Sequence, residues 1–158
     1  MTAGHAADER YVRRAMALAM RAAQNGDVPI GAVLVCNDAT FEAFNEKERL
    51  PDPTAHAEML VLRNAARALD RWRLTEATLY VTKEPCIMCA GAIVAARIER
   101  LVFGCPDPKG GAAGSIVDVF ALEELNHRVE VTRGVLADET GAQLQAFFAA
   151  RRGNVEQR

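Results

Sequence analysis

The sequence of 158 residues lacks any apolar run of 18 residues, the length that a membrane-spanning helix needs. Its first residues also lack the basic region and apolar stretch of a signal peptide. From these two absences we expect a soluble, cytoplasmic protein with no membrane contact. Because internal repeats and low-complexity linkers are missing too, we expect one domain over residues 1–158, with loose ends at 1–8 and 153–158.

A basic excess is missing as well, since the formal net charge is −2 at pH 7. Proteins that coat nucleic acid without sequence preference usually carry clear positive charge, so any nucleic-acid contact must be local. Cysteine is scarce, and a reducing cytoplasm argues against disulfides between the 4 cysteines. Cys86 and Cys89 stand three residues apart, for which metal binding is the first interpretation. We interpret Cys36 and Cys105 as ordinary apolar thiols.

The pattern of apolar residues predicts helices that alternate with strands. Asp8 is a plausible N-cap for the first helix, and Pro53 suits the first position of the second. The predicted helices cover residues 9–25, 53–69, 85–97, 116–125 and 138–152. The predicted strands cover residues 29–36, 40–45, 77–82, 101–103, 129–132 and 135–136. This order indicates an α/β protein whose central sheet is covered on both faces, with its third and fourth strands parallel.

Two predicted strand-to-helix junctions hold residues suited to chemistry. His56 and Glu58 begin one helix, and Cys86 and Cys89 begin the next, at the sheet edge where α/β proteins place their sites. The positive end of a helix favours thiolates, and two thiolates with one imidazole make three zinc ligands. Three protein ligands leave a fourth position for water, as in catalytic zinc sites. Because two thiolates weaken the Lewis acidity of zinc, a nearby carboxylate would have to move the proton of that water.

His56 and Glu58 present a geometric difficulty, because residues two apart on an ideal helix point about 200° away from each other. Their convergence requires an irregular first turn. Taken singly, a C-x-x-C pair is often structural or redox-active, and a glutamate near a histidine is usually a plain helix carboxylate. The combination H-x-E … P-C-x-x-C, with its histidine and first cysteine 30 residues apart, is far more specific and is the signature of zinc deaminases.

Residues 52–58 and 84–92 resemble the bacterial tRNA-specific adenosine deaminases, members of the cytidine-deaminase-like zinc deaminase superfamily, and the resemblance extends over 10–152. It implies a three-layer α/β/α fold with a mixed central sheet of about five strands. It also implies a homodimer with one Zn²⁺ per subunit. The implied reaction is hydrolytic deamination of adenosine to inosine at the wobble position of a tRNA anticodon loop, using zinc-activated water and Glu58 as the proton shuttle.

The segments that resemble the tRNA enzymes in particular are the loop 107–115 and the tail 147–152. Physically, a Gly-rich loop can bring backbone amides near phosphate, and an aromatic side chain beside arginines can stack a base. Of the two tail phenylalanines, Phe148 is expected to be the exposed one. The resemblance implies that an anticodon stem-loop is bound by the following residues, of which the asparagine orients the nucleoside: Pro29, Asn45, Ala57, Asp107, Lys109, Phe148 and Arg152.

Two alternatives remain open at this point. A free-base or nucleoside deaminase of the guanine or cytosine type would keep the zinc and Glu58 but would act without RNA. A non-catalytic, zinc-stabilised RNA-binding module would keep the metal for structure alone, with Glu58 incidental.

Overall fold

The computed structural model describes residues 2–156 of the chain. Helices and strands alternate along it, as the apolar periodicity predicts. Their order is α1 (Ala3–Gln24), β1 (Gly31–Cys36), β2 (Ala39–Phe44), α2 (Ala57–Leu69), β3 (Ala77–Lys83), α3 (Ile87–Ala95), β4 (Arg100–Cys105), the 3-10 turn η1 (Val119–Ala121), β5 (Glu130–Thr132) and α4 (Ala137–Glu156).

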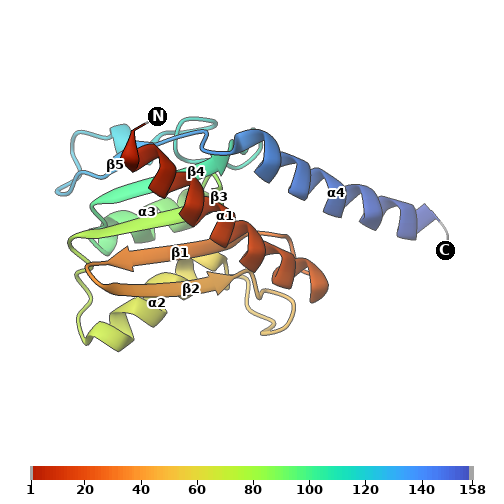
Figure 1. Ribbon diagram of the computed structural model, residues 1–158, viewed down its shortest axis with the longest axis horizontal. Coiled ribbons are helices and arrows are strands. Elements are labelled where there is room, and N and C mark those ends of the chain that lie inside the picture. The colour runs from red at the N-terminus through yellow and green to blue at the C-terminus, as the bar shows by residue number, and fades with distance from the viewer. Residues whose placement is uncertain (1, 157–158) are drawn as a thin grey trace.

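The strands form one mixed sheet in the order β2-β1-β3-β4-β5 (Figure 1). β1 runs antiparallel to both of its neighbours, β2 and β3. β3, β4 and β5 run parallel to one another. The predicted parallel pairing of the third and fourth strands and the predicted mixed sheet of about five strands are therefore confirmed.

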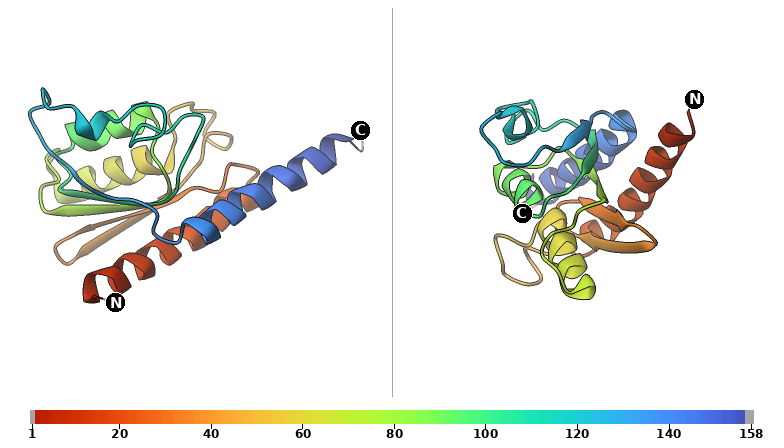
Figure 2. Two further views of the ribbon diagram at one scale, coloured as in Figure 1. Left: turned by 90° about the horizontal axis from the view of Figure 1, so that it is seen from above. Right: turned by 90° about the vertical axis from the view of Figure 1, so that its left-hand side faces the viewer.

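Helices cover both faces of the sheet, which confirms the three-layer α/β/α prediction (Figure 2). α1 and α4 lie on one face, and α2, α3 and η1 lie on the other. α1 approaches β1 so closely that a Cβ on Gly31 would stand 1.9 Å from the carbonyl oxygen of Ala15. Glycine at position 31 therefore allows the backbone of α1 to lie against the start of β1.

The N-terminal residues 3–8 are helical, so the prediction of a loose segment is wrong for them. Thr2, and not Asp8, is the N-cap of α1. Asp8 is instead buried, and its two carboxylate oxygens accept hydrogen bonds of 2.7 and 2.6 Å from the guanidinium of Arg100 on β4. This bidentate salt bridge attaches the start of α1 to the sheet, which explains why residues 3–8 are helical.

The predicted helix over 116–125 is also wrong, because only the short turn η1 is helical there. The amides of Ile116 and Val119 donate to the carbonyls of Gly111 and Ala112, at 2.9 Å in both cases. Backbone hydrogen bonds to the preceding loop thus replace those that a helix would make. The predicted strand at 135–136 is absent as well, since Leu136 adopts a positive φ of 55°.

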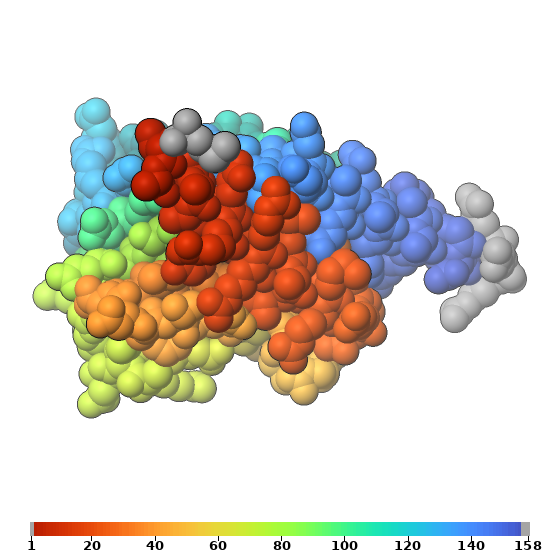
Figure 3. All heavy atoms as spheres, in the orientation of Figure 1, coloured from red at the N-terminus to blue at the C-terminus, as the bar shows by residue number. Residues whose placement is uncertain are grey.

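α4 runs farther than predicted, to Glu156, so residues 153–156 are helical, while 157–158 lie outside the described residues. Its first turns pack on β4, where the amide of Cys105 donates to the hydroxyl of Thr140 at 2.9 Å. Its second half projects from the body of the molecule (Figure 3). Over residues 2–156, no helix has both the length and the apolar character of a membrane span.

Candidate metal centre and active site

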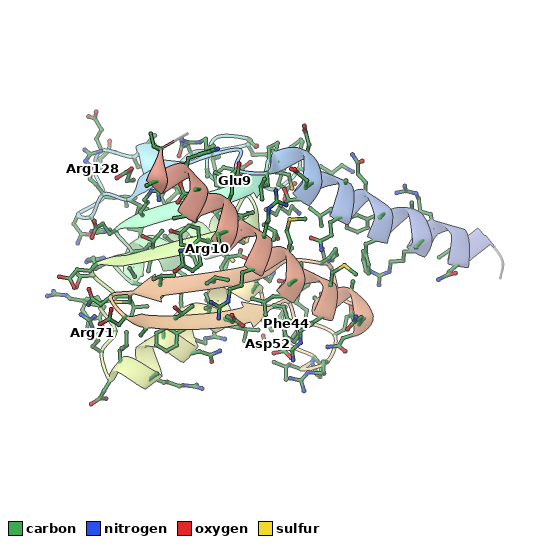
Figure 4. All side chains as sticks on the ribbon, in the orientation of Figure 1. Glu9, Arg10, Phe44, Asp52, Arg71 and Arg128 are labelled. Carbon is green, nitrogen blue, oxygen red and sulfur yellow. The ribbon has the colours of Figure 1, made fainter. Side chains whose placement is uncertain are left out.

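α2 and α3 begin at the same edge of the sheet. Because β2 and β3 are both antiparallel to β1, they run in one direction and end at one edge. The chain enters α3 directly from β3, and it enters α2 from β2 through the loop 45–56. In Figure 4, Phe44 and Asp52 mark this edge, whereas Arg71 lies at the opposite end of the sheet. The two junctions that the sequence singles out therefore face the same region.

The start of α2 resolves the geometric difficulty with His56 and Glu58. The helix begins at Ala57, so the prediction that Pro53 opens it is wrong. His56 is the N-cap residue, with an extended backbone at φ −72° and ψ 148°. Since His56 lies outside the regular helix, the ideal angle between residues two apart does not apply to it, and its imidazole can turn toward the side that Glu58 faces.

Asn45 holds this helix start from a different segment of the chain. Its side-chain oxygen accepts a hydrogen bond of 2.8 Å from the amide of Ala57, the first residue of α2. That amide would otherwise be an unpaired helix donor, because the His56 side chain makes no capping bond. Asn45 is buried, with 2% of its surface exposed. Its role in orienting a nucleoside remains a prediction, whereas its role in the fold is to accept the helix amide that the His56 side chain leaves uncapped.

His56, Cys86 and Cys89 lie together in a triangle of ligand atoms. The Nδ1 atom of His56 is 3.7 Å from the sulfur of Cys86 and 3.6 Å from that of Cys89. Around a tetrahedral zinc ion, a Cys sulfur and a His nitrogen lie about 3.6 Å apart. The three residues form the one cluster of at least three potential metal ligands within the described part of the chain. Their spacing therefore suits a tetrahedral metal.

Cys86 occupies the N-cap of α3, and Cys89 lies in its first turn. A hydrogen bond from Cys89 lowers the pKa of Cys86 to about 3, which favours the thiolate, the form that binds metals. Conversely, the hydrogen bond with Cys86, and burial, raise the pKa of Cys89. Binding of a metal ion would displace the proton of the Cys89 thiol, because the thiolate is the form that binds metals.

Glu58 is buried beside this cluster, with 4% of its surface exposed. Its Oε1 atom has no hydrogen-bond partner among the described residues. Burial raises the pKa of its carboxyl above the usual value, against the opposing effects of a hydrogen bond from Cys89 and the charge of His56. An unpaired buried carboxylate oxygen is costly to the fold, and such groups concentrate at functional sites. A water, an ion or a substrate is the natural partner for this atom.

The loop 107–115 lies against the start of α3, but the Asp107 carboxylate is paired within the protein, partly with the loop and partly with β3. One oxygen accepts from the amides of Lys109 and Gly110, at 3.1 and 3.2 Å, and the other lies 3.0 Å from the ammonium of Lys83. The Lys109 side chain is exposed. The sequence analysis did not single out Glu84, which directly precedes the predicted helix over 85–97. Its buried carboxylate binds backbone amides of this loop.

The remaining predicted substrate residues fall into two groups. Pro29 and Ala57 are buried, one before β1 and one at the first position of α2. Phe148 and Arg152 are exposed on α4, where they line a surface hollow together with Arg151. The residues of this hollow belong to the second half of α4. That half of the helix extends past the edge at which β2 and β4 end (Figure 1).

Comparison with known proteins decides between the deaminase families. Residues 6–152 match the MafB19-like deaminase family. The chain is 51% identical over 142 residues to the tRNA-specific adenosine deaminase of Bacillus subtilis, covering 89% of this chain and 88% of that protein. It also superposes with a TM-score of 0.82 on a solved structure from work on A-to-I editing by tRNA:A34 deaminases at the wobble position. That pair shares 43% identity and covers 85% of this chain and 99% of the other.

The chain belongs to the tRNA-specific adenosine deaminases.

It is therefore an enzyme of the hydrolase class. The structure of a guanine deaminase from Nitrosomonas europaea is also similar, with a TM-score of 0.75 at 23% identity over 89% of this chain and 84% of that one. At this identity the likeness shows the fold alone. The His56, Cys86 and Cys89 triad is the metal-binding arrangement typical of zinc deaminases.

Removal of one ligand sulfur tests the metal centre. Cys89→Ala is expected to reduce bound zinc from about one ion per chain to near zero, because two ligands hold zinc far more weakly than three. Cys105→Ala is the matched control, since Cys105 is also a buried thiol but lies outside the cluster. Zinc is measured by mass spectrometry of the purified variants, with circular dichroism to verify folding. Equal zinc content in the two variants would exclude Cys89 as a ligand.

Proposed function

We propose that this protein converts adenosine to inosine at position 34, the wobble position, of a tRNA anticodon loop. The observation that carries the proposal is the buried, unpaired Oε1 atom of Glu58 beside the His56, Cys86 and Cys89 triad. A carboxylate so placed can move protons next to a metal. Membership of the tRNA-specific adenosine deaminases supports this substrate over a free base.

His56, Cys86 and Cys89 hold one zinc ion per subunit. The matched sulfur–nitrogen distances of 3.7 and 3.6 Å and the lowered pKa of Cys86 support this ligand set. When bound, zinc supplies a Lewis acid that lowers the pKa of a coordinated water. We place the protein in the reducing cytoplasm, where both ligand thiols stay free of disulfides.

Glu58 carries the protons of the hydrolysis. The oxygen of water forms a bond to C6 of the adenine, and the bond from C6 to the exocyclic nitrogen breaks. One proton of the water ends on N1 of inosine, and the other leaves with ammonia. The raised pKa of the buried Glu58 carboxyl suits it to accept a proton from the water and to pass it on near neutral pH.

Exposed residues at the same end of the molecule bind the RNA around the target base. Lys109 on the 107–115 loop contacts a phosphate of the RNA backbone. On α4, Phe148 stacks on a neighbouring base and Arg152 binds the backbone beside it. Their exposure supports these roles, as does the hollow on the projecting half of α4. Asp107 acts by shaping the loop through Lys109 and Gly110, in addition to any contact of its own with RNA. Asn45, Pro29 and Ala57 line the nucleoside end of the site.

The experiment compares the wild type with Glu58→Gln on an anticodon stem-loop that carries adenosine at position 34. The wild type is expected to form inosine. Glu58→Gln is expected to keep its fold and its zinc but to lose at least about a hundredfold in kcat, because the proton carrier is gone. Glu123→Gln, an exposed carboxylate on the loop before β5, is the matched control and should react like the wild type. Inosine is quantified by sequencing and nucleoside chromatography.

Two results would contradict the proposal. Deamination of free guanine, cytosine or adenosine without reaction on the stem-loop would favour a free-base or nucleoside enzyme. Unchanged behaviour of Glu58→Gln, with zinc bound and no inosine formed by either protein, would favour a non-catalytic RNA-binding module.

A homodimer is part of the proposal, and an apolar groove between α2 and α3 supports it. Met59 of α2 and Ala95 of α3 line this groove with Trp72, which is 59% exposed. So large an exposed aromatic side chain beside an apolar groove is typical of a subunit interface.

Ala95→Arg tests this surface, because Ala95 is exposed and its replacement should not disturb the fold of one chain. The variant is expected to sediment as a monomer, while the wild type and the control Ala6→Arg, on the exposed side of α1, sediment as dimers. Analytical ultracentrifugation of zinc-loaded protein measures this. A dimeric Ala95→Arg variant would place the interface elsewhere.

A further inference from the structure

Glu84 has a buried carboxylate that the proposed chemistry does not use. It lies at the junction of β3 and α3, two residues before the ligand Cys86, and 4% of its surface is exposed. Its Oε1 atom accepts from the amide of Asp107 at 3.0 Å and from the hydroxyl of Ser115. Its Oε2 atom accepts from the amides of Ala113 and Ser115, at 3.0 and 3.1 Å. One side chain therefore holds both ends of the 107–115 loop.

Backbone contacts join the same loop to the metal ligand. The amide of Ala112 donates to the carbonyl of Pro85 at 2.8 Å, and Gly111 forms an isolated β-bridge with Cys86. The amide of Glu84 itself donates to the carbonyl of Cys105 at 2.9 Å. The loop and Cys86 are thus joined by one network of hydrogen bonds, and the Glu84 side chain lies at the centre of that network.

Position 111 requires glycine because the Glu84 carboxylate occupies the space in which a Cβ atom would lie. A Cβ at position 111 would stand 2.3 Å from both Cδ and Oε2 of Glu84, and the third atom near it is Oε1 of the same side chain. Its φ angle does not lie in the positive region that favours glycine. The sequence therefore needs glycine at 111 to make room for Glu84, and an added methyl group would push the carboxylate off its four donors.

We propose that Glu84 is a positioning residue that sets the 107–115 loop at a fixed place relative to Cys86, so that RNA held by the loop presents its adenosine to Glu58. This inference rests on the proposed function. The loop carries Lys109, the exposed cation assigned to the RNA backbone. Glu84 touches neither substrate nor metal in this role, and it acts through the loop backbone.

The chemistry of glutamine makes a sharp test possible. Glu84→Gln keeps the volume of the side chain but replaces one acceptor oxygen with an NH₂ group, which would face N–H donors. The hydrogen bond from the amide of residue 84 to Cys105 survives the substitution, so the metal ligands should stay in place. A residue that merely fills space would tolerate this change.

The experiment measures zinc content, kcat and KM on the stem-loop for Glu84→Gln, Glu84→Ala, Gly111→Ala and the double variant Glu84→Ala/Gly111→Ala. Glu84→Gln is expected to keep about one zinc, to raise KM about ten- to hundredfold and to change kcat far less, because loss of hydrogen bonds to a buried charge frees the loop. Gly111→Ala should raise KM in the wild-type background. It should add nothing to Glu84→Ala, since the carboxylate that its methyl group meets is then absent.

Ser115→Ala removes only the hydroxyl donor at an exposed position and keeps the test valid if Glu84→Gln fails to fold. It should raise KM by a smaller factor, whereas Glu124→Gln, an exposed control, should leave KM unchanged. A wild-type KM for both Glu84→Gln and Ser115→Ala would overturn the proposal. So would loss of zinc in Glu84→Gln, or additive effects in the double variant.

Hydrogen exchange separates this proposal from the proposed function, because it needs no substrate. In Glu84→Gln the amides of residues 107–115 should lose protection while those of α2 keep theirs. If the wild type fails to deaminate the stem-loop, the proposed function fails, and hydrogen exchange still reports whether Glu84 holds the loop. Unchanged protection of residues 113 and 115 would contradict the positioning role directly.

Discussion

The hydrogen bond from the amide of Ala57 to the side-chain oxygen of Asn45 is the contact on which the site depends. A helix must satisfy its first amides, and the residue at its N-cap usually does so with its own side chain. In α2 the N-cap is His56, which makes no such bond. Because Asn45 supplies the acceptor from the end of β2, the imidazole of His56 is left to approach Cys86 and Cys89 while Glu58 stays inside the helix.

α3 repeats this arrangement at the neighbouring junction. Its N-cap is Cys86, which also makes no capping bond with its side chain. The segment before it is fixed instead by the 107–115 loop, through the Pro85 carbonyl and the Glu84 carboxylate. Both helix starts therefore keep a ligand side chain free and leave the backbone to be held by groups from elsewhere in the chain. Because β2 and β3 end at one edge, the two ligand-bearing starts face each other.

The chemistry of the site could be predicted from the sequence because it depends on residue types at short spacing. The α/β class followed from periodicity, which is also local, whereas the mixed sheet of about five strands followed from the family resemblance. The start of α2 could not be predicted, because the preference for proline at a first helical position pointed to Pro53, whereas a distant side chain, Asn45, moved the start to Ala57. Asp8 was misinterpreted as a cap for the same kind of reason, since its partner Arg100 is 92 residues away in sequence.

Glu84 and the 116–125 segment could not be predicted on similar grounds. A glutamate before Pro85 is a common way to open a helix, and nothing near it in sequence reveals that its partners are the amides of 107–115. The glycine at position 111 was the sequence signal for the contact with Glu84. A glycine in a Gly-rich loop is, however, ordinarily interpreted as a source of backbone freedom. The apolar residues of 116–125 matched a helical period, yet their amides bind the preceding loop.

The central claim is that Asn45 frees His56 for the metal, and the affinity for zinc tests it most directly. Zinc affinity is measured by competition with a chelator for the wild type, Asn45→Ala and Asn45→Asp. Aspartate keeps an acceptor for the amide of Ala57, and alanine does not. The account predicts that Asn45→Asp binds zinc about as tightly as the wild type and that Asn45→Ala binds it about tenfold or more weakly, because the first amide of α2 loses its partner. Zinc affinity of Asn45→Ala equal to that of the wild type would contradict it.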